Sequence, residues 1–192
     1  MRILCFGDSN TYGYDPRSYF GEPYREPWPD LLAKETGHTV FNAGQNGREI
    51  PHTPWQYQQF ETLLSCYPAF DLLTVMLGGN DLLQNPRFTA ADVAARMEDF
   101  FRFLRKRLPS SSLLLIASVP MQRGAWVNEE RLLRESDRLC DAYRDLADRL
   151  GIHFADSRNW KVEKVFDGVH FSQEGHRAFA QGLGKALFDF PV

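Results

Sequence analysis

The segment Arg2-Ile3-Leu4-Cys5-Phe6-Gly7-Asp8-Ser9-Asn10 joins an apolar run to a short polar turn. Its apolar part, residues 2–6, is typical of a buried strand, and Ser9 follows close behind that strand. A hydroxyl held rigidly in such a turn can act as a nucleophile if the chain also supplies a base, an orienting group for the base and donors for an oxyanion. The segment therefore predicts both the first strand of the fold and a candidate nucleophile.

Later apolar segments repeat the strand pattern of residues 2–6. They lie at residues 39–42, 71–77 and 112–119, with a shorter one at residues 152–155. Their near-continuous apolar character is typical of strands in a parallel sheet that is covered on both faces. We therefore expect these segments to form the central sheet of the fold.

The segments between these strands carry helical patterns. We expect Thr89 to cap a helix that Pro109 ends, and Asn128 to cap a helix that stops at Gly151. The other helices are expected at residues 31–36, around residues 56–64 and from Ser172 onward, where the last one should bury Phe179, Leu183, Leu187 and Phe190. The alternation predicts a flavodoxin-like three-layer α/β/α sandwich, one domain over residues 1–192 around a parallel sheet of about five strands.

Length and charge narrow the class of protein. The chain has 192 residues, 43% of them hydrophobic, which is enough to bury a sizeable core in one domain. Its net charge of -3 comes from 22 basic and 25 acidic residues without a basic cluster, so neither nucleic acid nor an anionic membrane is an expected partner. The apolar runs are too short to span a bilayer, and we expect a soluble, cytoplasmic protein. Nothing in the sequence indicates an oligomeric state.

The cysteines are expected to have no catalytic role. Cys5, Cys66 and Cys140 are odd in number, widely spaced and embedded in apolar or helical sequence. This pattern is typical of buried, reduced thiols. The carboxylates and histidines show no helical ligand spacing for zinc or magnesium, so neither a metal nor another cofactor is expected.

Four polar segments follow predicted strands. In a doubly wound sheet, ligands bind beyond the carboxyl ends of the strands, so segments that are distant in sequence should meet at one edge. These segments are Ser9 with its neighbours, residues 42–47, residues 78–81 and residues 167–170. Each one alone is ordinary turn chemistry. Their joint occurrence beyond successive strands favours a catalytic site.

The four segments resemble the signature blocks of the SGNH hydrolases, the GDSL esterase and lipase superfamily, over essentially the whole chain. Gly-Asp-Ser-Asn followed by Thr-Tyr-Gly, then Asn-Gly-Arg, then Leu-Gly-Gly-Asn-Asp, is most similar to small bacterial arylesterases and acyltransferases. Two positions depart from the pattern. Asn10 stands where the family name has leucine, and Gly79 stands where close relatives often carry threonine. Neither change removes a reactive group.

The resemblance implies a role for each block. Ser9 would be the nucleophile, His170 the general base and Asp167 the group that fixes the tautomer and orientation of the imidazole. The backbone N–H groups of Ser9 and Gly47 and the side-chain amide of Asn80 would stabilise the oxyanion. His176, in the first turn of the last predicted helix, is a minor alternative to His170 as the base.

The substrate is less constrained by the sequence. Tyr12, Trp126 and Phe171 flank the loops of the predicted site, and we expect them to line a substrate pocket. Without a lid domain or a long lipid-binding insertion, small esters with a short acyl chain are favoured, with acyl transfer to an alcohol as a related reaction. A carbohydrate O-deacetylase that uses the same residues is an alternative.

A different class of function also remains open at this point. Residues 6–13 resemble a hydroxyl- and glycine-rich phosphate loop at the end of a strand, as in a flavodoxin-like protein that binds FMN and carries electrons. That interpretation leaves Asn80, Asp167 and His170 without a task. It also requires a helix to begin promptly after the loop, where the sequence predicts a continuing loop.

Overall fold

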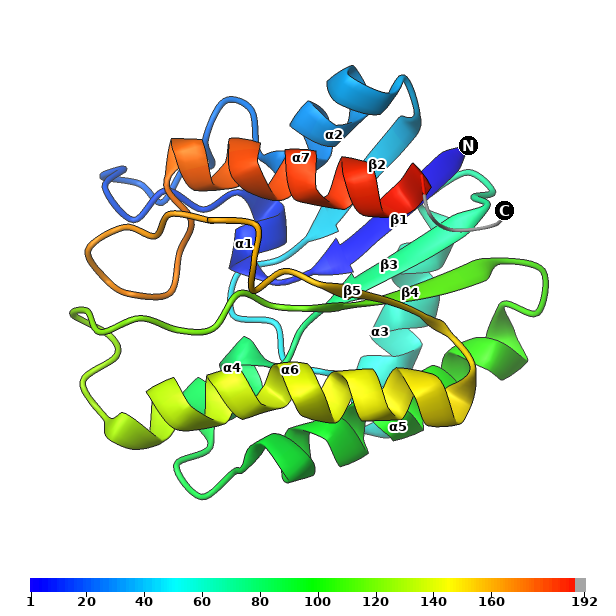
Figure 1. Ribbon diagram of the computed structural model, residues 1–192. Helices are drawn as coiled ribbons and strands as arrows, with labels where there is room; N and C mark the ends of the chain where they lie inside the picture. Colours follow the sequence, from blue (N-terminus) through cyan, green and yellow to red (C-terminus); the bar gives the residue numbers. More distant parts are fainter. Residues whose placement is uncertain (189–192) are drawn as a thin grey trace.

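A five-stranded parallel sheet forms the centre of the protein in this computed structural model, which describes residues 1–188. The strands are β1 (Arg2–Gly7), β2 (Thr39–Gly44), β3 (Leu72–Met76), β4 (Ser112–Ala117) and β5 (His153–Asp156). They lie in the order β2-β1-β3-β4-β5 (Figure 1). The chain passes from β1 to β2 on one side and then crosses to β3 on the other, so the strand order reverses at β1. All five predicted strands are confirmed.

Helices cover both faces of the sheet. They are α1 (Ser9–Tyr12), α2 (Trp28–Thr36), α3 (Pro54–Ser65), α4 (Gly79–Gln84), α5 (Ala90–Arg107), α6 (Glu130–Leu150) and α7 (Gln173–Phe188). The α2 and α7 helices pack on one face, while α3, α5 and α6 pack on the other (Figure 1). The predicted three-layer sandwich is therefore confirmed.

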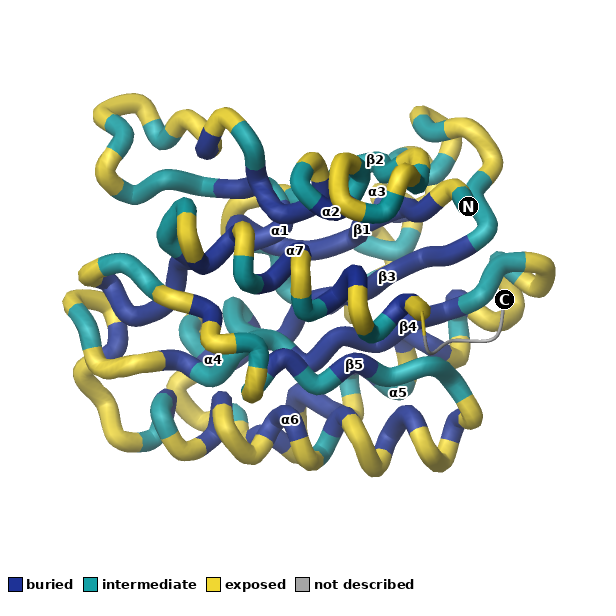
Figure 2. Tube along the Cα trace, turned by 45° about the horizontal axis from the view of Figure 1, so that its top comes forward, coloured by how far each residue is buried: buried dark blue, intermediate teal, exposed yellow. Residues whose placement is uncertain are grey.

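The alternation of side chains along β1 divides the core into two layers. Leu4 and Phe6 pack toward α3 and α5, whereas Ile3 and Cys5 pack toward α2 and α7. Burying one such side chain stabilises the fold by about 1.5–3 kcal/mol. Figure 2 shows the result: the inner strands β1, β3 and β4 are buried along most of their length, the edge strands β2 and β5 are mostly of intermediate exposure, and the outer faces of the helices are exposed.

The helix ends follow the sequence only in part. Thr89 caps α5 in a capping box, in which its hydroxyl accepts from the N–H of Asp92 and the carboxylate of Asp92 accepts from the N–H of Thr89. The predicted cap of α6 is wrong, because Glu129 and not Asn128 occupies that position. Phe190, predicted to be buried by the last helix, lies outside the described residues.

Two further predictions concern the burial of the cysteines and the length of the apolar segments. Cys5 and Cys140 are buried free thiols, but Cys66, at the end of α3, is exposed, so the prediction of burial is wrong for this residue. Within residues 1–188, no helix combines the length and the apolar character that crossing a membrane requires.

Candidate active site

Ser9 is the first residue of α1, directly beyond the end of β1. Asp8 caps this short helix, and its Oδ1 accepts a hydrogen bond of 2.9 Å from the backbone N–H of Asn10. The helix folds back tightly on the strand: a Cβ at Gly7 would lie 2.0 Å from Oγ1 of Thr11. Glycine is therefore required at this turn, which holds the Ser9 hydroxyl at the edge of the sheet.

Ser9, His170 and Asp167 are in direct contact, although they come from opposite ends of the chain. The Oγ of Ser9 lies 2.9 Å from Nε2 of His170, and Nδ1 of His170 lies 2.6 Å from Oδ2 of Asp167. An ionised carboxylate has no proton to donate, so the hydrogen bond between Asp167 and Nδ1 requires a proton on Nδ1. In the neutral imidazole Nε2 then has no proton, and it accepts the hydrogen bond of the Ser9 hydroxyl. The geometry is that of a nucleophile, a base and an orienting carboxylate.

The carboxylate of Asp167 is stabilised as an anion. Burial alone would raise its pKa, but hydrogen bonds from the His170 ring and from the backbone N–H groups of His170 and Val169 bring the pKa below its ordinary value. The two backbone bonds, to Oδ1, measure 2.8 and 2.9 Å. Asp167 therefore holds both the backbone and the ring of His170.

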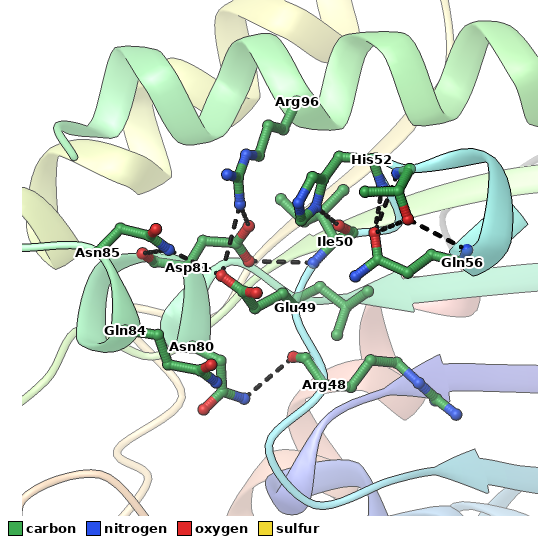
Figure 3. A network of polar contacts seen from close by, with 12 residues as sticks. Arg48, Glu49, Ile50, His52, Gln56, Asn80, Asp81, Gln84, Asn85 and Arg96 are labelled. Atoms are coloured by element: carbon green, nitrogen blue, oxygen red, sulfur yellow. Dashed lines mark hydrogen bonds and ion pairs between the residues drawn. The ribbon is translucent and has the colours of Figure 1, made fainter.

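The loop after β2 approaches the site from the neighbouring strand. Gly47 adopts a φ of 71°, a conformation that favours glycine. The loop is attached to α4: Nδ2 of Asn80 donates to the carbonyl of Arg48 over 3.0 Å (Figure 3). In addition, Nε2 of Gln84 donates to the carbonyl of Gly47 over 3.1 Å. An amide has two N–H donors, so Asn80 can bind this carbonyl and a second acceptor at once.

A buried carboxylate secures the same loop, a role that the sequence did not reveal. Asp81 is 0% exposed, and it accepts from the backbone N–H of Ile50 over 3.1 Å and from Nη1 of Arg96 over 2.9 Å (Figure 3). Burial raises its pKa to about 6. Asn85 adds a hydrogen bond of 2.7 Å to Glu49 in this loop. In the sequence, the only indication of this role is that Asp81 directly follows Asn80, a residue of the predicted site.

Arg48 joins the loop to the strand that leads to Ser9. Its guanidinium lies 4.2 Å from the ring centroid of Phe6 and donates to the carbonyl of Gly7 over 2.7 Å and to the carbonyl of Ala43. Burial lowers the pKa of Arg48 to about 10. The contact with Gly7 ties this loop to the turn that holds the nucleophile.

Two aromatic rings flank His170. The ring centroid of Tyr14 lies 4.8 Å from that of His170, and the ring centroid of Trp126 lies 5.1 Å from it. Trp126 is 51% exposed, and its backbone N–H donates to the carbonyl of Asp167 over 3.1 Å. Trp126 was among the three aromatic residues predicted to line the pocket, whereas Tyr14 was considered for that role but not chosen. Tyr12 lies at the end of α1, and its pocket role stays a prediction.

Two other sequence hypotheses do not fit the geometry. Phe171 is buried and packs against His176 and Phe179 in the core under α7, so the prediction that it lines a substrate pocket is wrong. His176 is also buried: its Nδ1 accepts from the backbone N–H of Trp28 over 3.3 Å, and burial lowers its pKa to about 3. It cannot replace His170 as the base beside Ser9.

Within residues 1–188, no three His, Cys, Asp or Glu side chains are grouped to hold a metal ion.

Solved structures with the same fold cover almost the whole chain. A protein from Agrobacterium tumefaciens str. C58 assigned as an arylesterase is 28% identical, with a TM-score of 0.85 over 99% of each chain. A carbohydrate acetylesterase family member from Sinorhizobium meliloti is 26% identical, with a TM-score of 0.81 over 97% of this chain and 96% of the other. The native aryl esterase of M. smegmatis, at 23% identity, has the same fold with a TM-score of 0.84 over 99% of each chain.

The sequence of the chain gives one family assignment. A search of curated proteins found no match. The model of the GDSL-like Lipase/Acylhydrolase family matches residues 5–178, a range that includes Ser9, Gly47, Asn80, Asp167 and His170. The FMN-carrier alternative has no support in these comparisons. The chain therefore belongs to the GDSL-like Lipase/Acylhydrolase family and is a carboxylic ester hydrolase.

Proposed function

We propose that the protein hydrolyses small carboxylic esters through an acyl-enzyme intermediate on Ser9. The contact of Ser9 Oγ with His170 Nε2 at 2.9 Å, continued to Asp167, supports this proposal. His170 takes the hydroxyl proton as Oγ bonds to the acyl carbon, and returns it to the leaving alcohol as the ester C–O bond breaks. A water molecule then gives its proton to His170 as it attacks the acyl-enzyme, and His170 returns that proton to Ser9 as the acid leaves.

The oxyanion would be bound by three N–H donors. These are the backbone N–H groups of Ser9 and Gly47 and the second N–H of the Asn80 amide. The hydrogen bonds of Asn80 and Gln84 to the loop carbonyls support this arrangement, because they hold Gly47 and Asn80 in one rigid unit. Preorganised donors of this kind stabilise the developing charge without reorganising during the reaction.

The groups around His170 suit a small acyl or aryl group. Tyr14 and Trp126 present aromatic surface next to the base, and Trp126 is half-exposed to an incoming ligand. Such walls bind planar or short apolar groups. The similarity to the A. tumefaciens arylesterase points the same way.

The test is hydrolysis of p-nitrophenyl esters of increasing acyl length, by the wild type, Ser9→Ala and Ser157→Ala. Ser157 is a buried serine at the end of β5, where its hydroxyl donates to the carbonyl of Ala117 over 2.6 Å. We expect the highest kcat/KM with acetyl or butyryl esters, complete loss in Ser9→Ala and full activity in Ser157→Ala. Activity of Ser9→Ala within tenfold of the wild type, or preference for long acyl chains, would refute the proposal.

Carbohydrate O-deacetylation is a second candidate, supported by a cavity beside the loop after β2. This cavity has a volume of about 880 Å³. Its lining combines backbone of the loop with aromatic and amide side chains. Trp55, which is 66% exposed, is one of the aromatic residues. The other residues named here are Gly47, Arg48, Tyr67 and the glutamines Gln45, Gln56, Gln58 and Gln59. Exposed aromatic faces and amides are the groups that pack on and hydrogen-bond to sugar rings. Because Gly47 belongs to both the cavity and the proposed oxyanion hole, a sugar bound there could present its acetyl group to Ser9.

This candidate is tested by comparing an acetylated disaccharide with p-nitrophenyl acetate as substrates of Trp55→Ala. Phe188→Ala is the matched control, because Phe188 is also an exposed aromatic residue but lies at the end of α7 and does not line the cavity. If sugars bind in the cavity, Trp55→Ala lowers kcat/KM for the acetylated disaccharide alone. If kcat/KM for the acetylated disaccharide is the same in Trp55→Ala as in the wild type, and kcat/KM for p-nitrophenyl acetate is also unchanged, the cavity does not bind the substrate.

We also propose a cytoplasmic location. The free, exposed thiol of Cys66 supports it, because such thiols persist in reducing compartments. Fractionation of source cells should recover the esterase with cytosolic markers, and recovery from the medium would contradict this location.

A further inference from the structure

Asn10 lies beside the nucleophile and contacts the segment that carries the base. It is the second residue of α1, and its side chain is buried, with the residue 8% exposed. Nδ2 of Asn10 donates to the carbonyl of Val169 over 3.2 Å, and Oδ1 accepts from the backbone N–H of Phe171 over 2.9 Å. The residue between these two backbone groups is His170.

The chemistry of the amide matches both contacts. One side of the Asn10 amide is a donor that faces a carbonyl, and the other side is an acceptor that faces an N–H, so the orientation of the amide is determined. The side chain thus pairs with the backbone on either side of His170 as a neighbouring strand would. This pairing fixes the backbone of His170 relative to the short helix that begins with Ser9.

Other contacts hold the same segment from within its own loop. Nζ of Lys164 donates to the carbonyl of Val169 over 3.1 Å, and the N–H of Val165 donates to the carbonyl of His170 over 2.9 Å. These bonds and those of Asp167 join the segment to its own loop. Asn10 joins it to α1, and the separation between Ser9 Oγ and His170 Nε2 depends on the relative position of these two parts.

We propose that Asn10 is a positioning residue, which sets the distance between His170 and Ser9 through its two hydrogen bonds to the backbone around His170. The inference rests on the proposed function of Ser9 and His170. Leucine at this position has a similar volume but cannot make either hydrogen bond, and the N–H of Phe171 would lose its acceptor. His170 would then be free to shift away from the 2.9 Å separation that proton transfer requires.

The test compares Asn10→Leu with Ser9→Ala and with Thr74→Val. Thr74 is a buried residue of β3 whose side chain hydrogen-bonds to Cys5 far from the base, so Thr74→Val is a matched exchange of a buried polar for an apolar side chain. In Asn10→Leu we expect kcat for p-nitrophenyl acetate to fall by about 10²-fold while KM changes by less than about threefold, because misplaced groups lose the reaction step and not the binding of substrate. Thr74→Val should keep the wild-type kcat.

Proton NMR gives a readout that a general loss of stability does not move. The proton between His170 Nδ1 and Asp167 should resonate far downfield in the wild type and in Thr74→Val, and it should shift or broaden in Asn10→Leu. If Asn10→Leu does not fold, Asn10→Asp replaces it. Asn10→Asp keeps the acceptor for Phe171 but loses the donor to Val169, and the same loss of kcat at constant KM is expected.

The outcomes separate the two claims. An active Ser9→Ala refutes the proposed function itself. An inactive Ser9→Ala, combined with a folded Asn10 variant whose kcat and downfield resonance equal those of the wild type, refutes the positioning role of Asn10 and leaves the proposed function standing.

Discussion

Asp167 holds His170 through one hydrogen bond to the ring and one to the backbone N–H. In Asp167→Asn the amide can keep the backbone bond, but its NH2 group would face Nδ1 and select the tautomer with a proton on Nε2. That tautomer cannot accept the proton of Ser9, so kcat should fall by about 10⁴-fold with p-nitrophenyl acetate. Asp71→Asn is the control, because Asp71 is a partly exposed aspartate at the opposite end of the sheet. A variant that keeps more than a tenth of the wild-type kcat would remove Asp167 from the mechanism.

Asn80 is proposed to act on the transition state more than on the bound ester. Asn80→Ala should therefore lower kcat by about 10²–10³-fold and leave KM nearly unchanged. Gln84→Ala is the matched control, because Gln84 also binds a carbonyl of the loop after β2 but is not proposed to touch the oxyanion. A rise in KM at constant kcat would assign Asn80 to ground-state binding, and equal losses in both variants would indicate a role in holding the loop.

At single positions, the sequence predicted which residues come together at the candidate site better than it predicted the direction in which their neighbours point. Ser9, Asp167 and His170 follow from the residue types and the family motifs. Phe171 was misplaced because neighbouring residues of an extended segment point to opposite sides. His170 points to Ser9, so Phe171 points into the core. Tyr14 reaches the site through the fold of its loop, which no local pattern encodes.

The loop after β2 is held to α4 and α5 by the buried Asp81, and its stability should depend on this carboxylate. Asp81→Ala leaves the N–H of Ile50 and the guanidinium of Arg96 without their acceptor. We expect a loss of about 3 kcal/mol in the free energy of unfolding, measured with urea. Arg102→Ala breaks an exposed ion pair with Glu98 on the same α5 helix and should cost less than about 1 kcal/mol. An equal decrease in the free energy of unfolding of the two variants would show that Asp81 stabilises the fold no more than an exposed ion pair does.

The long elements were predictable and the short ones were not. The α5 and α6 helices span several turns, so their buried residues recur with a period that the sequence shows. The α1 and α4 helices have only four and six residues and offer no such period. Neither short helix was predicted, although the loop expected beyond residues 6–13 does continue to the start of α2 at Trp28. The cap of α6 was misassigned because neither Asn128 nor Glu129 makes a side-chain cap bond there.

Over the whole molecule, the order of strands and helices predicted the three-layer fold and the edge on which the site lies. Parallel strands end at the same edge, so segments after β1, β2, β3 and β5 had to converge. What the order could not give is the 2.9 Å separation of Ser9 and His170, the contact of Asp81 with the loop after β2, or the contact of Asn10 with the segment around His170. Those distances depend on side-chain packing between segments that are far apart in the sequence.

The stability of the whole fold should respond to acid through two buried groups with opposite effects. Burial lowers the pKa of His176 to about 3, so between the ordinary pKa of histidine, about 6.5, and pH 3 the unfolded state binds a proton that the folded state refuses, and stability falls as the pH falls. Burial raises the pKa of Asp81 to about 6, so between pH 6 and its ordinary value the folded state binds the extra proton, and stability rises as the pH falls.

His176→Asn separates these two contributions. An asparagine keeps an acceptor for the N–H of Trp28 but does not titrate. Between pH 6 and pH 4, the unfolding free energy of the variant should lose less than that of the wild type, by up to about 1.4 kcal/mol per pH unit, in urea titrations. Parallel pH profiles of the two proteins would mean that His176 accepts a proton in the folded state.

The central claim, that Ser9 is the nucleophile activated by His170, is tested most directly by reaction with a fluorophosphonate and mass spectrometry of the resulting peptides. The contact of 2.9 Å between Ser9 Oγ and His170 Nε2 predicts one adduct per chain, on Ser9. Ser157→Ala should be labelled like the wild type, whereas His170→Ala should be labelled at a far lower rate because Ser9 has lost its base. An adduct on another residue, or labelling of His170→Ala at the wild-type rate, would contradict the account.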